Sequence, residues 1–183
     1  VVSSLEAFRK YQLENAWVWE HQALTRARFV AGDPAIGAAF EQIRCEILCQ
    51  QRDLAKLREE VLAMRGKMHE NLGTKGTSDL FDLKHDFGGL VDVEFIVQYL
   101  ILAHAHQHPQ LTGNLGNIAL LRIAAECGLI PADLADIARD AYREYRRLQH
   151  LRRLNNLDSR IDIAPHAERI AAVRALWKHV FKD

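Results

Sequence analysis

Asp92 and Glu94 are the acid pair whose spacing and setting most suggest chemistry, because a double glycine closely precedes them. On a β-strand, residues two apart face the same way, so these two carboxylates could share a metal ion. On an α-helix each residue turns by about 100°, so the same residues point roughly 200° apart and could not share one. Because we expect a helix here, the pair predicts bonds to backbone amides or to basic residues of neighbouring elements, and no metal site.

The segment Gly88–Ala105, which reads GGLVDVEFIVQYLILAHA, is the element around which we expect the chain to fold. It is apolar on nearly every face, and it is too long for an ordinary buried strand. These two features favour a helix enclosed by other helices. A membrane span needs about 20 predominantly apolar residues, whereas this run begins with two acids, so we expect no membrane partner.

The residues around the acid pair are the main candidates for a motif or docking role. We expect Asp92 to meet a basic partner such as Lys84, or another domain, and we favour docking for this residue. Glu94 shares its helical face with Gln98, so we expect it to have a structural role inside the bundle. The two glycines are expected to allow a close backbone approach at the helix start. The full candidate set is Lys84, Gly88, Gly89, Asp92, Glu94 and Gln98.

A basic face runs along a helix expected from Pro131 to about Asn155. Interleaved acids such as Asp140 and Glu144 favour a solvated face, and contact with a phosphate or an acidic partner is the alternative. A stand-alone module that binds RNA or an acidic protein through this face would be a rival to an enzyme domain. The candidate contacts are Arg139, Arg143, Arg146 and Arg153.

Histidines and cysteines offer a second rival, a metal-binding bundle. His104 and His108 share a helical face and could bind a metal if an acid joined them, although histidines more often end a helix. Cys45 and Cys49 lie one turn apart, and a zinc site would need two further ligands that the sequence does not place there. The odd number of cysteines, three, suits reduced thiols and therefore a cytoplasmic protein.

Composition narrows the class of protein. The 183 residues contain 24 Lys+Arg and 24 Asp+Glu, so no net charge draws the chain toward nucleic acid or membranes. With 49% hydrophobic residues, the chain can bury a full core. There is no GxxxxGK[ST], GxSxG or HExxH motif, so we assign no catalytic residue. The absence of an initiator Met leads us to expect a piece of a longer protein.

Apolar periodicity and capping residues predict an all-α bundle of about seven or eight helices. Asp33-Pro34 should open one helix, Asn114 should cap another, and Gly128 should end it. No segment shows convincing strand alternation, and a glycine-rich loop should lead into a short extended piece at Leu80–Lys84. Helices are expected over about 3–15, from the tryptophan pair to near 32, and over 33–48, 53–72, 88–105, 115–127, 131–155 and from 164 onward.

Three stretches carry a resemblance to a known family. DLKHDFGGLVDVEFIVQYL resembles the motif of the glutamine synthetase adenylyltransferases, in which a basic residue, a double glycine and Asp-x-Glu-Phe lead into a long helix. NAWVWEHQALTRARFVAGD resembles the segment that closes the family's second nucleotidyltransferase domain. AYREYRRLQHLRRLN resembles a helix of its helical domain. Phe87 departs from the small residue, proline or acid expected at that place.

The resemblance implies a place in a larger enzyme. In that family one half attaches AMP from ATP to a tyrosine of glutamine synthetase and the other half removes it, under control of glutamine and the PII signal protein. The implied partners are therefore glutamine synthetase, PII and a preceding nucleotidyltransferase domain. The family's Gly-Ser and Asp-x-Asp signature, which holds magnesium, is absent here, so ATP and Mg²⁺ would belong to the upstream domain.

The same resemblance implies a domain organisation. Residues 1–32 would be the helical tail of the preceding nucleotidyltransferase domain, and residues 33–183 the C-terminal helical bundle of the adenylylating half. The isolated chain is then expected to hold no cofactor and to transfer no AMP. The chain would serve nitrogen regulation as an accessory or regulatory domain.

Overall fold

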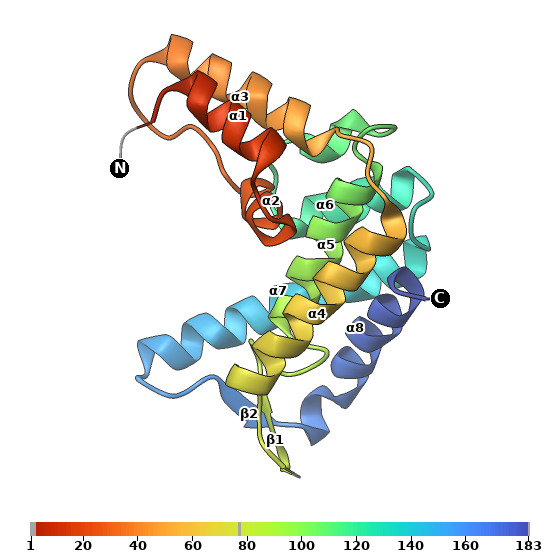
Figure 1. Cartoon of the computed structure of the whole chain (residues 1–183). Helices are drawn as coiled ribbons and strands as arrows, with labels where there is room; N and C mark the ends of the chain where they lie inside the picture. Colours follow the sequence, from red (N-terminus) through yellow and green to blue (C-terminus); the bar gives the residue numbers. More distant parts are fainter. Residues whose placement is uncertain (1–2, 77, 183) are drawn as a thin grey trace. The chain divides into compact units, whose positions relative to one another are not determined.

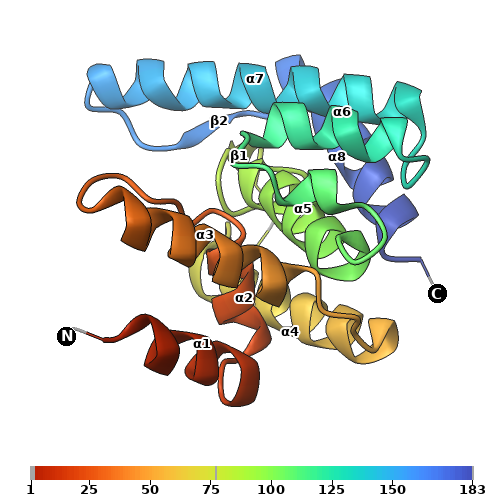
Figure 2. The same ribbon diagram turned by 90° about the horizontal axis from the view of Figure 1, so that it is seen from above.

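The computed structural model describes residues 3–76 and 78–182, and within them the chain is predominantly helical, which confirms the predicted fold class (Figures 1 and 2). The helices are α1 (Leu5–Glu14), α2 (Val18–Leu24), α3 (Pro34–Leu48), α4 (Leu54–Leu72), α5 (Leu90–His104), α6 (Asn117–Glu126), α7 (Ala132–Leu154) and α8 (Ala167–Val180), with short 3₁₀ turns η1 (Pro109–Thr112) and η2 (Ala164–His166). None of the helices in the described part of the chain has the length and apolar character that a membrane crossing requires.

The chain forms two compact units, each with its own packed interior. The first contains residues up to Val61 together with Gln98–Leu115, and the second contains Leu62–Val97 together with the residues from Gly116 onward. The sequence predicted that residues 1–32 belong to a preceding domain and residues 33–183 to the bundle. This division stays a prediction.

The first unit packs α1 and α2 against α3. Rings of Phe8 and Phe40 lie with centroids 5.7 Å apart between α1 and α3. Asp33 caps α3 by accepting the Ala35 amide at 2.8 Å, and Pro34 takes the first helical position, as predicted.

Helix α2 ends at Leu24, and the prediction that it continues to near Gly32 was wrong. The cause is a buried arginine from α3. Arg44 is 1% exposed, and its guanidinium donates to the carbonyls of Leu24 at 3.1 Å and Thr25 at 2.8 Å. These carbonyls lie where α2 ends, so a tertiary contact satisfies the groups that a longer helix would have bonded internally.

The second unit packs α7 against α6 and α8, with the first half of α5 buried in the unit. A short ribbon pairs β1 (Leu80–Asp82) with β2 (Arg160–Asp162) in antiparallel register, so that Phe81 lies opposite Ile161. The extended piece was predicted at Leu80–Lys84, whereas β2 was missed. Helix α6 is capped by Gly116 rather than by the predicted Asn114, whose amide instead donates to Glu41 at 3.3 Å.

Candidate functional site

The turn between β1 and α5 is held by two aspartates that bind backbone amides. Asp82 Oδ1 accepts the amides of Lys84 at 2.8 Å and His85 at 2.7 Å. Asp86, which is buried, accepts the Thr74 amide at 2.7 Å and the Asp82 amide at 2.8 Å. Burial raises the pKa of Asp82, but the hydrogen bonds from Ser159 and these amides outweigh it and hold the pKa below its usual value. Both carboxylates therefore hold the backbone of this loop in place.

The double glycine allows the close backbone approach that the sequence predicts. Gly88 has φ +95°, and a Cβ there would lie 2.9 Å from the carbonyl oxygen of Ile170 on α8. A Cβ on Gly89 would lie 2.7 Å from the carbonyl oxygen of Leu83. Only glycine fits both positions without local movement.

Asp92 lies inside the second unit and binds Arg65 of α4. Arg65 Nε lies 2.5 Å from Asp92 Oδ1, and each side chain is 1% exposed. The second carboxylate oxygen accepts the Gly88 amide at 2.6 Å. Burial raises the pKa of Asp92, and the contacts with Arg65 and Gly88 oppose that rise. The basic partner is therefore Arg65 and not Lys84, and the burial of Asp92 contradicts the docking role favoured from sequence.

Phe87 completes the environment of this ion pair. Its ring lies 4.6 Å from the Arg65 guanidinium carbon, in cation–π geometry. The His69 ring covers it at a centroid distance of 4.1 Å. Arg65 also donates to the His85 carbonyl at 2.9 Å, so the arginine links α4 to the turn between β1 and α5.

The other residues of the candidate set lie nearer the surface. Glu94 is partly exposed and accepts the Tyr142 hydroxyl proton at 3.2 Å, while Tyr142 accepts the Asn117 amide at 2.9 Å. Gln98 accepts the side-chain amide of Gln22 at 3.0 Å. The Lys84 side chain is exposed, and no ion pair of its ammonium group is found in residues 3–76 and 78–182. Its role in docking stays a prediction.

The arginines of α7 fall into two groups. Arg139 pairs with Asp136 at 2.5 Å and Arg143 with Asp140, each three residues apart on the helix. Both arginines are balanced by an acid, and Arg143 lies on the solvated face that the sequence favours, whereas the Arg139 side chain is only 24% exposed. Arg146 instead donates to the Gln149 side chain at 2.9 Å, and Arg153 is exposed. The interleaved acids therefore do not neutralise every arginine.

The histidine pair is not arranged as the metal alternative requires. Helix α5 ends at His104, so His108 lies beyond the helix and its amide donates to the His104 carbonyl at 2.9 Å. Burial, together with neighbouring His108 and His106, lowers the pKa of His104. Across the described residues, no group of three or more His, Cys, Asp or Glu side chains is placed to hold a metal ion.

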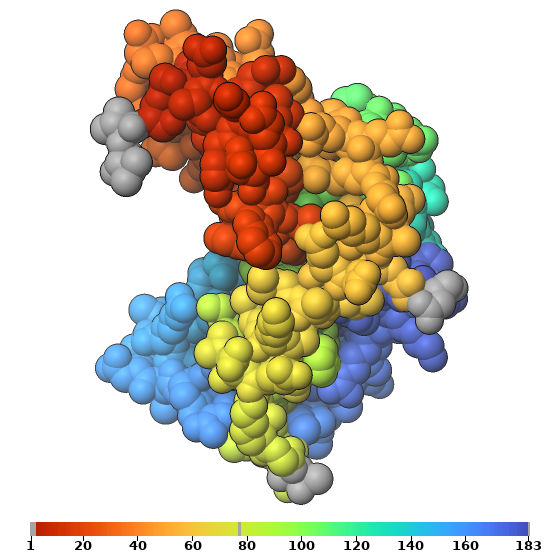
Figure 3. All heavy atoms as spheres, in the orientation of Figure 1, coloured from red at the N-terminus to blue at the C-terminus, as the bar shows by residue number. Residues whose placement is uncertain are grey.

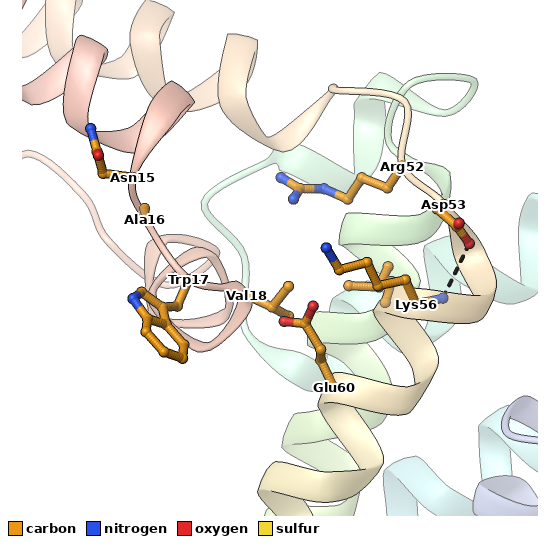
Figure 4. Close-up of a pocket in the computed structure, with 9 residues that line it drawn as sticks. Asn15, Ala16, Trp17, Val18, Arg52, Asp53, Lys56 and Glu60 are labelled. Atoms are coloured by element: carbon orange, nitrogen blue, oxygen red, sulfur yellow. Dashed lines mark hydrogen bonds between the residues drawn. The ribbon is translucent and has the colours of Figure 1, made fainter.

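A cavity of about 390 Å³ in the first unit was missed from sequence (Figure 4). Arg52, Lys56 and Glu60 reach into it from α4 and the residue stretch before it, opposite the Trp17–Val18 turn. The spacing of Lys56 and Glu60 was the available signal, since residues four apart share a helical face. The remaining lining residues are Asn15, Ala16, Asp53 and Leu57.

One wall of this cavity is fixed by a buried histidine. Arg52 Nη1 donates to His21 Nδ1 at 3.0 Å and Nη2 to the Ile47 carbonyl at 3.0 Å. Because arginine cannot accept, His21 Nε2 carries the ring proton, which it donates to the Gln12 carbonyl at 2.9 Å. The lining combines two cationic and two acidic side chains, so it has no excess charge that would select a simple anion.

Comparison with known proteins shows which family this chain is similar to. A family model described as glutamate-ammonia ligase adenylyltransferase matches residues 1–43, and one described as GlnD PII-uridylyltransferase matches residues 55–160. A bifunctional glutamine synthetase adenylyltransferase/adenylyl-removing enzyme of Aromatoleum aromaticum is 65% identical over 99% of this chain and 19% of that protein. Enzymes of the same description from Nitrosomonas europaea and Bordetella bronchiseptica are 52% and 56% identical over 99% and 98% of this chain, and over 21% and 19% of their own lengths.

The chain thus spans about a fifth of the length of the curated relatives that it matches. Identities of 52–65% over almost every residue of the chain place each of the motifs discussed above inside the matched region. The chain therefore belongs to the glutamine synthetase (glutamate–ammonia ligase) adenylyltransferase family, and its residues 55–160 to the family described as GlnD PII-uridylyltransferase.

Proposed function

We propose that this chain is the helical accessory part of a cytoplasmic enzyme that adenylylates and deadenylylates glutamine synthetase. The observation that carries the proposal is the 65% identity to a bifunctional enzyme over 99% of the chain. Within the longer protein, a nucleotidyltransferase domain would supply the carboxylates that hold Mg²⁺ and ATP. Glutamine synthetase and the PII protein are the proposed partners.

The hydrogen bonds and the ion pair made by the aspartates of the motif support an accessory role. Asp82 and Asp86 bind amides, and Asp92 binds Arg65 and the Gly88 amide. Two-metal phosphoryl chemistry needs clustered carboxylates that remain open to a metal ion. We therefore expect no transfer of labelled AMP to glutamine synthetase when the 183-residue chain is incubated with ATP and Mg²⁺. Transfer by the isolated chain would overturn the accessory role.

The exposed aromatic residues of α1 and α2 support contact with a preceding domain. Trp17 is 68% exposed and Trp19 is 50% exposed, and the adenylyltransferase model covers both residues. Burying such side chains against another domain would remove a large apolar area from water. The fluorescence that the double change Trp17→Phe with Trp19→Phe removes, taken as a difference, should be strongly quenched by acrylamide in the chain and weakly quenched in the longer protein. Equal quenching in the two proteins would contradict the contact.

Lys84 is the motif residue best placed for a docking role, because it is exposed on the turn that Asp82 and Asp86 hold rigid. Lys84→Glu in the longer protein should lower the adenylylation rate without changing the melting temperature of the isolated chain. Lys67→Glu, the same change at an exposed site on α4, is the matched control. Equal rates for the two variants would remove Lys84 from the proposal.

A further inference from the structure

The C-terminal end of α7 exposes three leucines together. Leu154 is 83% exposed, Leu157 is 54% exposed and Leu151 is 48% exposed. Leu151 and Leu154 are three residues apart and therefore share a helical face. A hollow of about 260 Å³ lies beside them, lined by His150, Arg153 and Leu154. Single exposed leucines are ordinary, but a group at one helix end with its own hollow is typical of a contact surface.

The packing of the second unit explains why this end is uncovered. In Figures 1 and 2, α6 and α8 lie along the first part of α7, and the second part of α7 extends beyond both helices. The space-filling view shows the same end of α7 at the edge of the surface of this unit (Figure 3). The connection that follows is held by Arg152, which donates to the Asp158 carbonyl at 2.5 Å, so the leucines stand on an ordered element.

Unneutralised positive charge coincides with these leucines. Along α7, Arg139, Arg143 and Arg147 each pair with an acid three residues earlier, and Arg152 pairs with Asp158 at 3.6 Å. Arg146 donates to the Gln149 side chain, and neither Arg146 nor Arg153 forms an ion pair with a described residue. The two arginines without an acid partner are therefore Arg146 and Arg153, which lie seven residues apart on one side of α7, next to the face that carries Leu154.

We propose that this α7 end patch, defined as Arg146, Leu151, Arg153, Leu154 and Leu157, docks an acidic amphipathic helix of a partner protein. Apolar residues on one face of such a helix would cover the leucines, and carboxylates along one edge of that face would pair with Arg146 and Arg153. Of the four arginines selected from the sequence, Arg139 and Arg143 pair with acids on their own helix and lie outside this patch.

Charge and composition favour a protein partner over nucleic acid or lipid. Nucleic-acid surfaces combine arginines or lysines with aromatic rings for stacking, whereas this patch presents leucines. Stable binding to a membrane surface needs a broad apolar face with many basic residues, whereas this patch has three leucines and two arginines without an acid partner. An apolar centre with a charged rim is the arrangement found in protein interfaces.

The test uses the whole 183-residue chain and a fluorescein-labelled synthetic helix with leucines along one face and glutamates elsewhere. The chain should bind this peptide in a saturable manner, and added salt should weaken binding. Leu154→Ser and the double variant Arg146→Glu with Arg153→Glu should each weaken binding at least about tenfold. Circular dichroism confirms that each variant is folded.

Two matched controls keep the result specific to the patch. Arg122→Glu makes the same charge change at an exposed site on α6, and Leu115→Ser removes a leucine that is 50% exposed elsewhere. Both should bind the peptide as the unchanged chain does. A peptide in which lysines replace the glutamates should not bind.

Several results would overturn the proposal. They are the absence of saturable binding, equal binding of the lysine peptide, and equal loss in the control variants. Tighter binding of phosphatidylserine vesicles or of poly(U) through the same patch would assign it to a membrane or to RNA instead. Dimers of the chain that Leu154→Ser dissociates would assign the patch to a second copy, which also overturns the proposal.

Discussion

Arg65 and Asp92 form an ion pair that neither water nor another domain can reach, since each side chain is 1% exposed and their charged atoms lie 2.5 Å apart. Arg65 comes from α4 and Asp92 from the first turn of α5, so the pair joins the two helices at the glycine turn. Burying two charges is costly, and the remaining oxygen of Asp92 is therefore satisfied by the Gly88 amide. The pair specifies where α5 begins relative to α4.

Asp92→Asn should destabilise the chain strongly. The change leaves the Arg65 charge buried without its counter-ion, and losing one partner of a buried pair costs about 3–5 kcal/mol. Urea titration of the chain would measure this loss in the free energy of unfolding. Glu94→Gln is the matched control, because Glu94 is partly exposed and accepts the Tyr142 hydroxyl, a bond worth about 1 kcal/mol. Equal losses for the two variants would contradict the assigned burial.

Gly88→Ala and Gly66→Ala should change stability in opposite directions. At Gly88 the backbone has φ +95°, and an added Cβ would meet the Ile170 carbonyl oxygen at 2.9 Å. We expect a loss of more than about 1 kcal/mol in the free energy of unfolding. Gly66 lies inside α4, and a Cβ added there would meet nothing within 4 Å outside its own helix backbone, so alanine should add about 0.5–1 kcal/mol by helix propensity. Chemical unfolding of both variants decides the matter, and a neutral Gly88→Ala would refute the close approach.

Elements that depend on local pattern were predictable, and contacts between distant residues were not. The central helix was evident because its apolar residues leave it no exposed face, and the cap of α3 follows from Asp33-Pro34. The end of α2 depends on Arg44, about twenty residues further along the chain. The local sequence around α2 does not predict such a contact.

In the candidate site, too, contacts between distant residues could not be predicted from the sequence. The acids, glycines and arginines could be selected by residue type, but the choice of Lys84 as partner of Asp92 relied on nearness in sequence. The structure brings in Arg65, which lies 27 residues before Asp92. The partner strand β2 and the cavity beside Trp17 were missed for the same reason, because each forms from segments that meet only after folding.

Tyr145→Phe should leave the chain as stable as before or more stable. Tyr145 is buried in the second unit, and its hydroxyl has no hydrogen-bond partner among the described residues. A buried polar group without a partner costs free energy, so its removal should raise the free energy of unfolding by about 1 kcal/mol or leave it unchanged. Tyr142→Phe provides the contrast, since that hydroxyl accepts from Asn117 and donates to Glu94, and its loss should destabilise. Urea midpoints compare the two; a costly Tyr145→Phe would reveal a partner of this hydroxyl.

The His21–Arg52 contact should make the first unit sensitive to acid. Burial, and then the nearby Arg52 charge, lower the pKa of His21 below its usual value of about 6.5, while Gln12 and Glu20 oppose the shift. The folded state therefore prefers the neutral ring. Its contribution to stability is present above about pH 6.5 and is lost as the pH falls through the lowered pKa of the folded state. Protonation would place a second N–H at Nδ1, facing the Arg52 guanidinium that now donates to it.

Urea midpoints measured between about pH 8 and pH 5 would show this loss, and His21→Gln should reduce the dependence because glutamine does not titrate there. Burial also lowers the pKa values of His85 and His104, so part of the dependence should remain in the variant. The control is His150→Gln on the exposed face of α7, which should retain the full dependence of the unchanged chain. If His21→Gln instead follows the same curve as His150→Gln, the buried ring does not stay neutral, and the hydrogen bond from Arg52 to Nδ1 is wrong.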